Sequence, residues 1–191
     1  MSARGRTALV GLFAALLLGG AGPGAGPGSG AGRGARGGAR SDAAPAGAAP
    51  APEWIAVPGG WRPMAELVPA GQARAGEGAV RADPPRAYGD PASGCFALLQ
   101  RVSAPVVGFD QARAIERLVR DLQAAGFQAG PGASELPFAG HGFEGRMRVV
   151  AAPDGGDRIA LRSAACFYNG REPDRCRAAC QAMLDSAGAT R

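Results

Sequence analysis

A stretch dominated by Gly, Ala and Pro divides the chain and limits which part of it can fold. It covers residues 23–52 and holds almost no large apolar side chain. Such a stretch has too little apolar surface to offset the conformational entropy that ordering would remove. We therefore expect residues 26–52 to form a disordered linker, and the remaining residues, 53–191, to form a single domain with its own core.

The residues before the linker have the layout of a secretory signal peptide. A basic start with Arg4 and Arg6 precedes an apolar run at residues 9–18, and small residues follow it. The apolar run is about half as long as a membrane-spanning helix requires. No cysteine follows it at the place of a bacterial lipobox. We expect residues 1–25 to be a signal peptide and the mature chain to be periplasmic or extracellular in a bacterium, with no transmembrane span.

The positive charge of the chain lies mostly outside the expected domain. The full sequence carries a formal net charge of +5, and residues 1–52 contribute +4 of it through five arginines and Asp42. Residues 53–191 hold 16 arginines and 15 acidic residues, so the expected domain is nearly neutral. A nearly neutral domain lacks the basic surface that binds phosphate backbones. We therefore expect no nucleic-acid partner.

The clearest secondary-structure element is a mid-chain helix from Asp110 to about Ala125. Asp110 can cap the first turn, and Gly126 follows at the place of a left-handed C-cap residue. Apolar residues recur at helical spacing along one face. These residues are Ile115, Leu118, Val119 and Leu122.

Further elements follow from alternation and turn residues. Residues 146–150 and 158–162 alternate polar and apolar side chains around a turn at 152–157, which predicts a hairpin whose second strand continues to 168. The other predicted elements are a short strand at 54–61 ended by a Pro-Gly-Gly turn, a possible strand at 78–82, a strand at 95–102 and a terminal helix at 173–187; residues 128–142 are predicted to be irregular. This order predicts an α+β fold, in which an antiparallel sheet is covered by the mid-chain and C-terminal helices.

The order of elements and the Pro58-Gly59-Gly60-Trp61 turn resemble the PsbP-like (DcrB-like) superfamily. The resemblance covers most of residues 53–187, and also includes an extended segment before the mid-chain helix and a long hairpin leading into the C-terminal helix. It implies an antiparallel sheet between helices, an exported or lumenal location, and a binding or assembly role. The superfamily shares no catalytic residues that map onto this chain. The cysteines and the Gly-rich segments depart from its usual pattern.

The chain has four cysteines, an even number that predicts two disulfides in an exported protein. Cys176 and Cys180 are four residues apart on the expected terminal helix, so both should face the sheet. A bond between them would close one helical turn and gain little stability. We favour Cys95–Cys180 with Cys166–Cys176, and the alternative is the exchanged pairing.

Two other chemistries use the same residues. Cys95 and His141, the single histidine, could act as nucleophile and base of a secreted cysteine hydrolase. Cys166, Cys176, Cys180 and His141 could form a zinc site, although short C-x-x-C spacing is absent. The favoured function is a monomeric, non-catalytic binding or assembly domain of the bacterial envelope, without a cofactor, whose partner is an unknown protein or envelope component.

Overall fold

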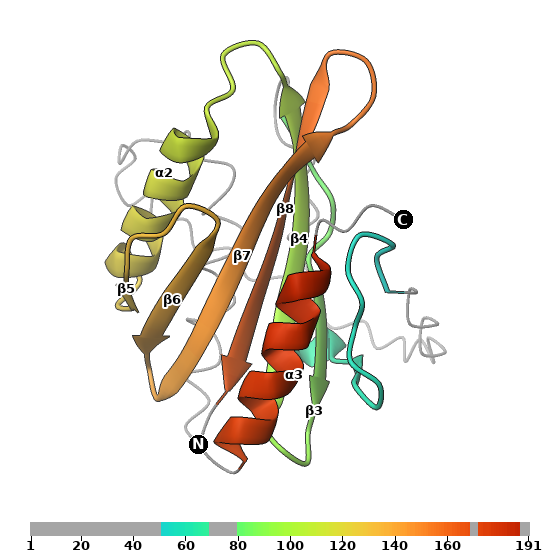
Figure 1. The fold of residues 1–191 in the computed structure, drawn as a ribbon, viewed down its shortest axis with the longest axis vertical. Helices are drawn as coiled ribbons and strands as arrows, with labels where there is room; N and C mark the ends of the chain where they lie inside the picture. Colours follow the sequence, from blue (N-terminus) through green and yellow to red (C-terminus); the bar gives the residue numbers. More distant parts are fainter. Residues whose placement is uncertain (1–50, 69–79, 169–171, 188–191) are drawn as a thin grey trace, which may run out of the picture.

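The computed structural model describes residues 51–68, 80–168 and 172–187. The expected signal peptide and all but the last two residues of the expected linker lie outside these ranges. The described residues form an eight-stranded, antiparallel sheet and two long helices (Figure 1). This arrangement confirms the expected α+β class. Among the described residues, no helix is long and apolar enough to cross a membrane.

Three strands of 11 residues form the centre of the sheet: β4 (Cys95–Pro105), β8 (Arg158–Tyr168) and β7 (Phe143–Pro153). Next to β7 the sheet continues with β6 (Glu135–Gly140) and β5 (Gln128–Ala129). On the side of β4 lie β3 (Arg86–Asp90) and then β1 (Arg62–Pro63), and the short strand β2 (Arg81–Ala82) also pairs with β4. The 3-10 turn η1 (Ala65–Leu67) follows β1 in the chain and contacts β3. The predicted hairpin is therefore confirmed as β7 and β8. Each strand is longer than the segment of alternating polar and apolar residues from which it was predicted.

One face of the sheet packs against the mid-chain helix α2 (Gln111–Ala124). The carboxylate of Asp110 accepts a hydrogen bond from the backbone N–H of Arg113 at 3.1 Å, which confirms the expected N-cap. Ile115, Leu118 and Leu122 are buried on this face of the sheet in a hydrophobic cluster that also contains side chains of β6, β7 and β8. The apolar stripe predicted from the sequence thus faces the sheet.

The opposite face packs against the C-terminal helix α3 (Pro173–Ser186), drawn in red over β8 and β4 in Figure 1. Successive residues of β4 alternate between the two clusters: Leu98 packs with α2, whereas Ala97 and Leu99 pack with α3. The two helices therefore cover opposite faces of one sheet. Pro173 begins α3 at the first helical position, where the missing N–H leaves no hydrogen bond unmade.

Three local expectations were wrong. Residues 54–57 form no strand: Ile55 is buried against the α3 cluster, and β1 begins only after the turn at Gly59 and Gly60. The segment at 128–142, expected to be irregular, contains β5 and β6. Strand β3, for which no strand was predicted, pairs with β4 over its whole length.

Candidate functional site

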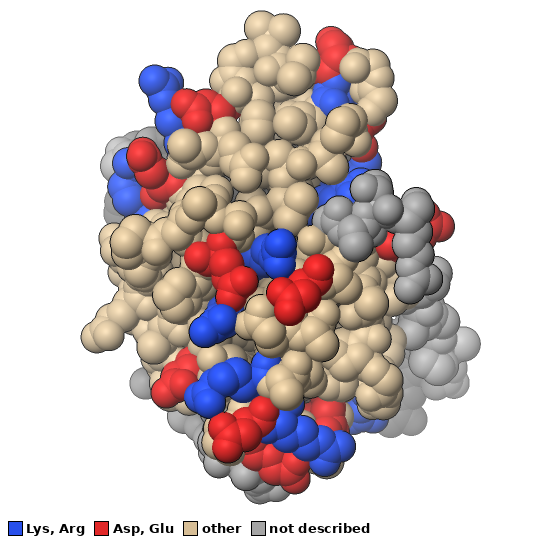
Figure 2. Space-filling model, in the orientation of Figure 1, with Lys and Arg blue, Asp and Glu red and all other residues tan. Residues whose placement is uncertain are grey.

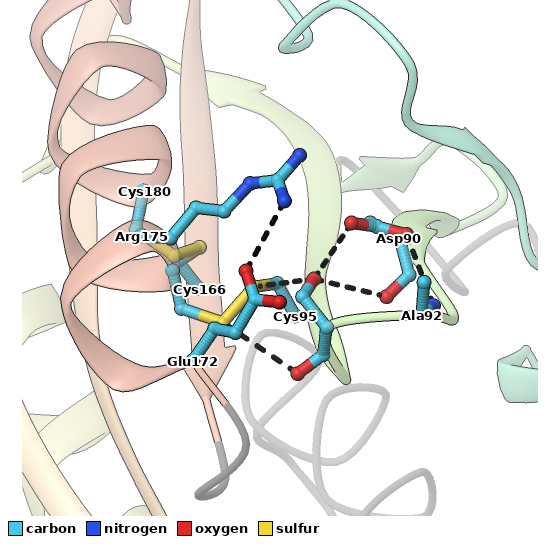
Figure 3. The surroundings of a disulfide bond; sticks show 9 residues. Asp90, Ala92, Cys95, Cys166, Glu172, Arg175 and Cys180 are labelled. Atoms are coloured by element: carbon cyan, nitrogen blue, oxygen red, sulfur yellow. Dashed lines mark hydrogen bonds and ion pairs between the residues drawn. A yellow bond between two sulfur atoms is a disulfide. The ribbon is translucent and has the colours of Figure 1, made fainter.

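All four cysteines form disulfides that fix α3 to the sheet. Cys95 is bonded to Cys176 and Cys166 to Cys180, with Cα–Cα distances of 5.5 and 5.7 Å. The favoured pairing of Cys95 with Cys180 was therefore wrong, and the alternative pairing is present. The four residues are buried within the α3 cluster, so both bonds lie inside the core. Figure 3 shows the bonds between the first turns of α3 and the sheet beneath.

The sheet register explains the pairing. Cys166 lies opposite Ala97, two residues into β4, whereas Cys95 is the first residue of that strand. Two strand residues span about 6.7 Å, and the four residues from Cys176 to Cys180 span about 6 Å along the helix. Because α3 runs antiparallel to β8, Cys176 in its first turn lies near Cys95 at the end of the sheet. Cys180, one turn later, lies near Cys166, which is further from that end. The spacing of the two cysteines on the helix thus matches the spacing of their partners along the strands.

The turn before β4 holds Cys95 in place. The hydroxyl of Ser93, 2 % exposed, donates a hydrogen bond to Oδ2 of Asp90 at 2.8 Å and lies 3.0 Å from Sγ of Cys95 (Figure 3). This hydroxyl, and then the backbone N–H of Ala92, lower the pKa of Asp90 below its usual range. An ionised Asp90 therefore organises the turn beside the disulfide.

The structure does not bring the two residues of the hydrolase alternative together. Cys95 is in a disulfide on the α3 face, so it offers no thiolate nucleophile. His141 lies in the turn between β6 and β7, where its Nε2 donates to the carbonyl oxygen of Ala125 at 2.8 Å. Its ring also packs edge-to-face on Phe127 at 4.9 Å. His141 thus caps the last turn of α2.

The zinc alternative fails for the same reason. Its three cysteine ligands, Cys166, Cys176 and Cys180, are consumed in the two disulfides, whereas zinc binds the thiolate form. Among the described residues, no group of three His, Cys, Asp or Glu side chains is placed to hold a metal ion.

A groove of about 970 Å³ runs between α2 and the segment after β5. Its floor includes Ile115, Val119 and Ala129, and Pro131 forms part of the opposite wall. Polar and charged side chains of α2 stand at its rim: Gln111, Glu116, Arg120 and Gln123. An apolar floor with a polar rim suits a protein segment or another amphipathic ligand.

A second hollow, of about 810 Å³, is lined by the end of α2, by β5, β6 and β7, and by Tyr168 and Arg177. Arg146 donates to Glu135 at 2.9 Å and to Gln181 of α3 at 3.0 Å. Arg177 lies over the ring of Tyr168, 5.7 Å from its centroid. Figure 2 shows acidic and basic side chains interleaved over this face. Because the charges are paired, the hollow has little net charge with which to attract an ionic ligand.

Sequence reasoning identified the cysteines as the residues of interest but missed both grooves. The groove beside α2 depends on β5 and the turn after it, in a segment predicted to be irregular. One arginine of the second hollow carried a signal: Arg146 occupies a polar position of the alternating hairpin, so it lies on the same face as Arg148, two residues later.

Comparisons with known proteins place few limits on this chain. No family model matches the sequence, and no curated protein matches it. Among solved structures, LpqN of Mycobacterium tuberculosis, described as involved in cell envelope biogenesis, is similar over 69 % of this chain and 79 % of its own. The two share 14 % sequence identity at a TM-score of 0.43. At this level neither the fold nor the role of LpqN transfers to this chain.

Proposed function

We propose that this chain is an exported, non-catalytic binding or assembly domain of the bacterial envelope, periplasmic or extracellular. In this proposal residues 1–25 direct export, residues 26–52 are a flexible linker and residues 53–191 form one monomeric domain. The partner is a protein or another envelope component, and binding needs no cofactor.

The observation that carries the proposal is that all four cysteines form disulfide bonds between α3 and the sheet. Disulfides persist in oxidising compartments and are rare in the bacterial cytosol. Both bonds are buried in the α3 cluster, where they support packing and offer no reactive thiol. This usage favours an extracytoplasmic protein that needs a rigid scaffold.

The groove beside α2 is the binding surface in this proposal. It lies on the helix that carries no disulfide, and its apolar floor is formed by Ile115 and Val119. The placement of one helix on each face of an antiparallel sheet also supports membership of the PsbP-like superfamily, whose members include binding and assembly modules.

Export is tested with the full chain in a bacterial host. We expect the wild type to be recovered from the periplasm or the medium, shortened near residue 25 and without alkylatable thiols. The matched control is Leu16→Arg with Leu17→Arg, which interrupts the apolar run and should leave an unshortened, cytoplasmic chain with reactive thiols. An unshortened wild-type chain in the cytoplasm, with four reactive thiols, would contradict the proposal.

The binding surface is tested by site-specific photo-crosslinking in the same host. A photoreactive residue at Ala112, which lines the groove, should crosslink to one partner species. The control position is Ala124, which is exposed on the same helix but does not line the groove. Equal crosslinking from both positions, or none from Ala112, would show that the groove is not the binding surface.

A further inference from the structure

Several arginines gather on the α3 face of the sheet, beyond the point where α3 ends. Arg101 of β4 lies directly opposite Arg162 of β8 in the register. Arg148 of β7 lies opposite Ala164, two residues from Arg162, so it is a diagonal neighbour on the same face. Like charges directly opposite one another destabilise a strand pair unless something compensates them.

The described acidic residues compensate two of these arginines. Arg101 forms ion pairs with Asp83, at 3.0 Å, and with Asp154. Arg148 donates from one terminal nitrogen to Asp185 at 3.3 Å. Arg162 has no hydrogen-bond or ion-pair partner among the described residues.

The inner nitrogens of two of the arginines add a second observation. Nε of Arg162 and Nε of Arg148 are both buried and without a hydrogen-bond partner. A buried donor without a partner is costly, and each such group in a native structure calls for an explanation, such as an ordered water or a bound ion. Both residues as a whole are half-buried, so part of each guanidinium side chain remains accessible.

The helix leaves this region uncovered. From Cys180 to Ser186 the helix advances about 9 Å, whereas Arg162 lies about 13 Å along β8 from Cys166, the partner of Cys180. Arg162 therefore lies just past the end of α3.

We infer that Arg162 and Arg148 form a binding site for an oxyanion, a phosphate or carboxylate group, at the end of α3. Guanidinium groups bind such groups through paired, charge-assisted hydrogen bonds, and one Nε–H with a terminal N–H forms the usual fork. A bound oxyanion would satisfy both inner nitrogens and compensate the charge of Arg162. The site is separate from the groove beside α2 and does not depend on the function proposed for it.

The test follows the Nε–Hε signals of Arg162 and Arg148 in nitrogen-15 NMR spectra of the purified protein. Inorganic phosphate and acetate are titrated separately at constant ionic strength, with chloride as the balancing ion. We expect both signals to shift in a saturable manner with at least one of the two probes. Saturation by phosphate assigns a phosphate ligand, and saturation by acetate alone assigns a carboxylate.

Two variants complete the test. Arg162→Gln should weaken the saturable binding about tenfold, read from the Arg148 signal, because one charged fork is lost. Arg113→Gln, a control on the exposed side of α2, should leave the affinity unchanged. Signals that shift linearly, or equally with chloride, would overturn the inference, as would unchanged affinity in Arg162→Gln with its fold intact by circular dichroism.

Discussion

Cys95, the first residue of β4, is bonded to Cys176 in the first turn of α3, 81 residues later in the sequence. The second bond, Cys166–Cys180, spans only 14 residues and lies one helical turn further along. Together they fix both the position and the direction of α3 on the sheet. The Cys95–Cys176 bond closes a chain loop that contains most of the fold, and the Cys166–Cys180 bond fixes the connection between β8 and α3.

The two bonds should differ in their contribution to stability. With both cysteines of a pair replaced by alanine, loss of Cys95–Cys176 should cost about 4.5 kcal/mol and loss of Cys166–Cys180 about 3 kcal/mol, because the longer loop restricts the unfolded chain more. Urea unfolding of each double variant measures the two free energies. An equal cost, or a larger cost for the short loop, would contradict this account of α3.

The Asp154 carboxylate should make stability depend on pH. The hydroxyl of Ser103, and then the guanidinium of Arg101, lower the pKa of Asp154 below its value in an unfolded chain. The ionised form therefore stabilises the fold above the ordinary aspartate pKa, and this contribution is lost as the pH falls through the lowered pKa. Asp154→Asn should cost about 1–2 kcal/mol at neutral pH and progressively less in acid.

The control for Asp154 is Asp157→Asn, which changes an exposed carboxylate in the same turn. It should alter the free energy of unfolding by less than about 0.5 kcal/mol. Urea unfolding of both variants and the wild type between neutral and acid pH measures the difference. A penalty for Asp154→Asn that is constant with pH would show that the Arg101–Asp154 ion pair does not stabilise the fold.

His141 should stabilise the end of α2 through its side chain and strain the turn through its backbone. Its φ of 54° lies in the left-handed region, and its Nε2 bonds to Ala125. His141→Ala should cost about 1 kcal/mol from the lost hydrogen bond. His141→Gly should cost less, because glycine adopts this backbone conformation without the penalty of about 1 kcal/mol. If thermal or urea unfolding showed His141→Gly to be less stable than His141→Ala, this role would be contradicted.

Gly145 should tolerate no side chain. A Cβ at this position of β7 would lie 2.3 Å from the carbonyl oxygen of Cys166 and 2.3 Å from Cζ of Phe138. Gly145→Ala should therefore destabilise the protein by about 2 kcal/mol or more, because both the strand and the Phe138 ring must move. Gly59→Ala, with open space around the new Cβ, is the matched control. Similar unfolding midpoints for the two variants would show that β7 and β8 are not packed as described.

Local patterns predicted the elements whose own sequence carries their signal. The helix α2 has a capping aspartate, an apolar stripe and a terminal glycine within 17 residues. Strand β6 was missed because residues 128–142 are rich in glycine, and Pro137 in the middle of the strand also argues against one. The carbonyl oxygen of Pro137 faces β5 and accepts from Gly130 at 3.1 Å. The missing N–H lies on the same side, opposite Gly130, so only the edge pairing with β5 loses a hydrogen bond and the pairing with β7 loses none.

Features that depend on register could not be predicted from local patterns. The disulfide pairing requires knowing that Cys166 lies opposite Ala97, and the opposed charges of Arg162 and Arg101, 61 residues earlier, require the register of β8 on β4. Neither relation is visible from spacing within a single element. The number of disulfides follows from composition and compartment, whereas their partners follow only from the assembled sheet.

Peptide mapping of the exported protein tests the central account most directly. Arg177 lies between Cys176 and Cys180, so trypsin separates these two cysteines and each bond gives its own linked peptide. Alkylation of any free thiol before digestion prevents thiol exchange, because exchange requires a thiolate. The account predicts Cys95 linked to Cys176, Cys166 linked to Cys180, and no alkylated cysteine. A free thiol at any of the four positions, or a peptide joining Cys95 to Cys180, would contradict it.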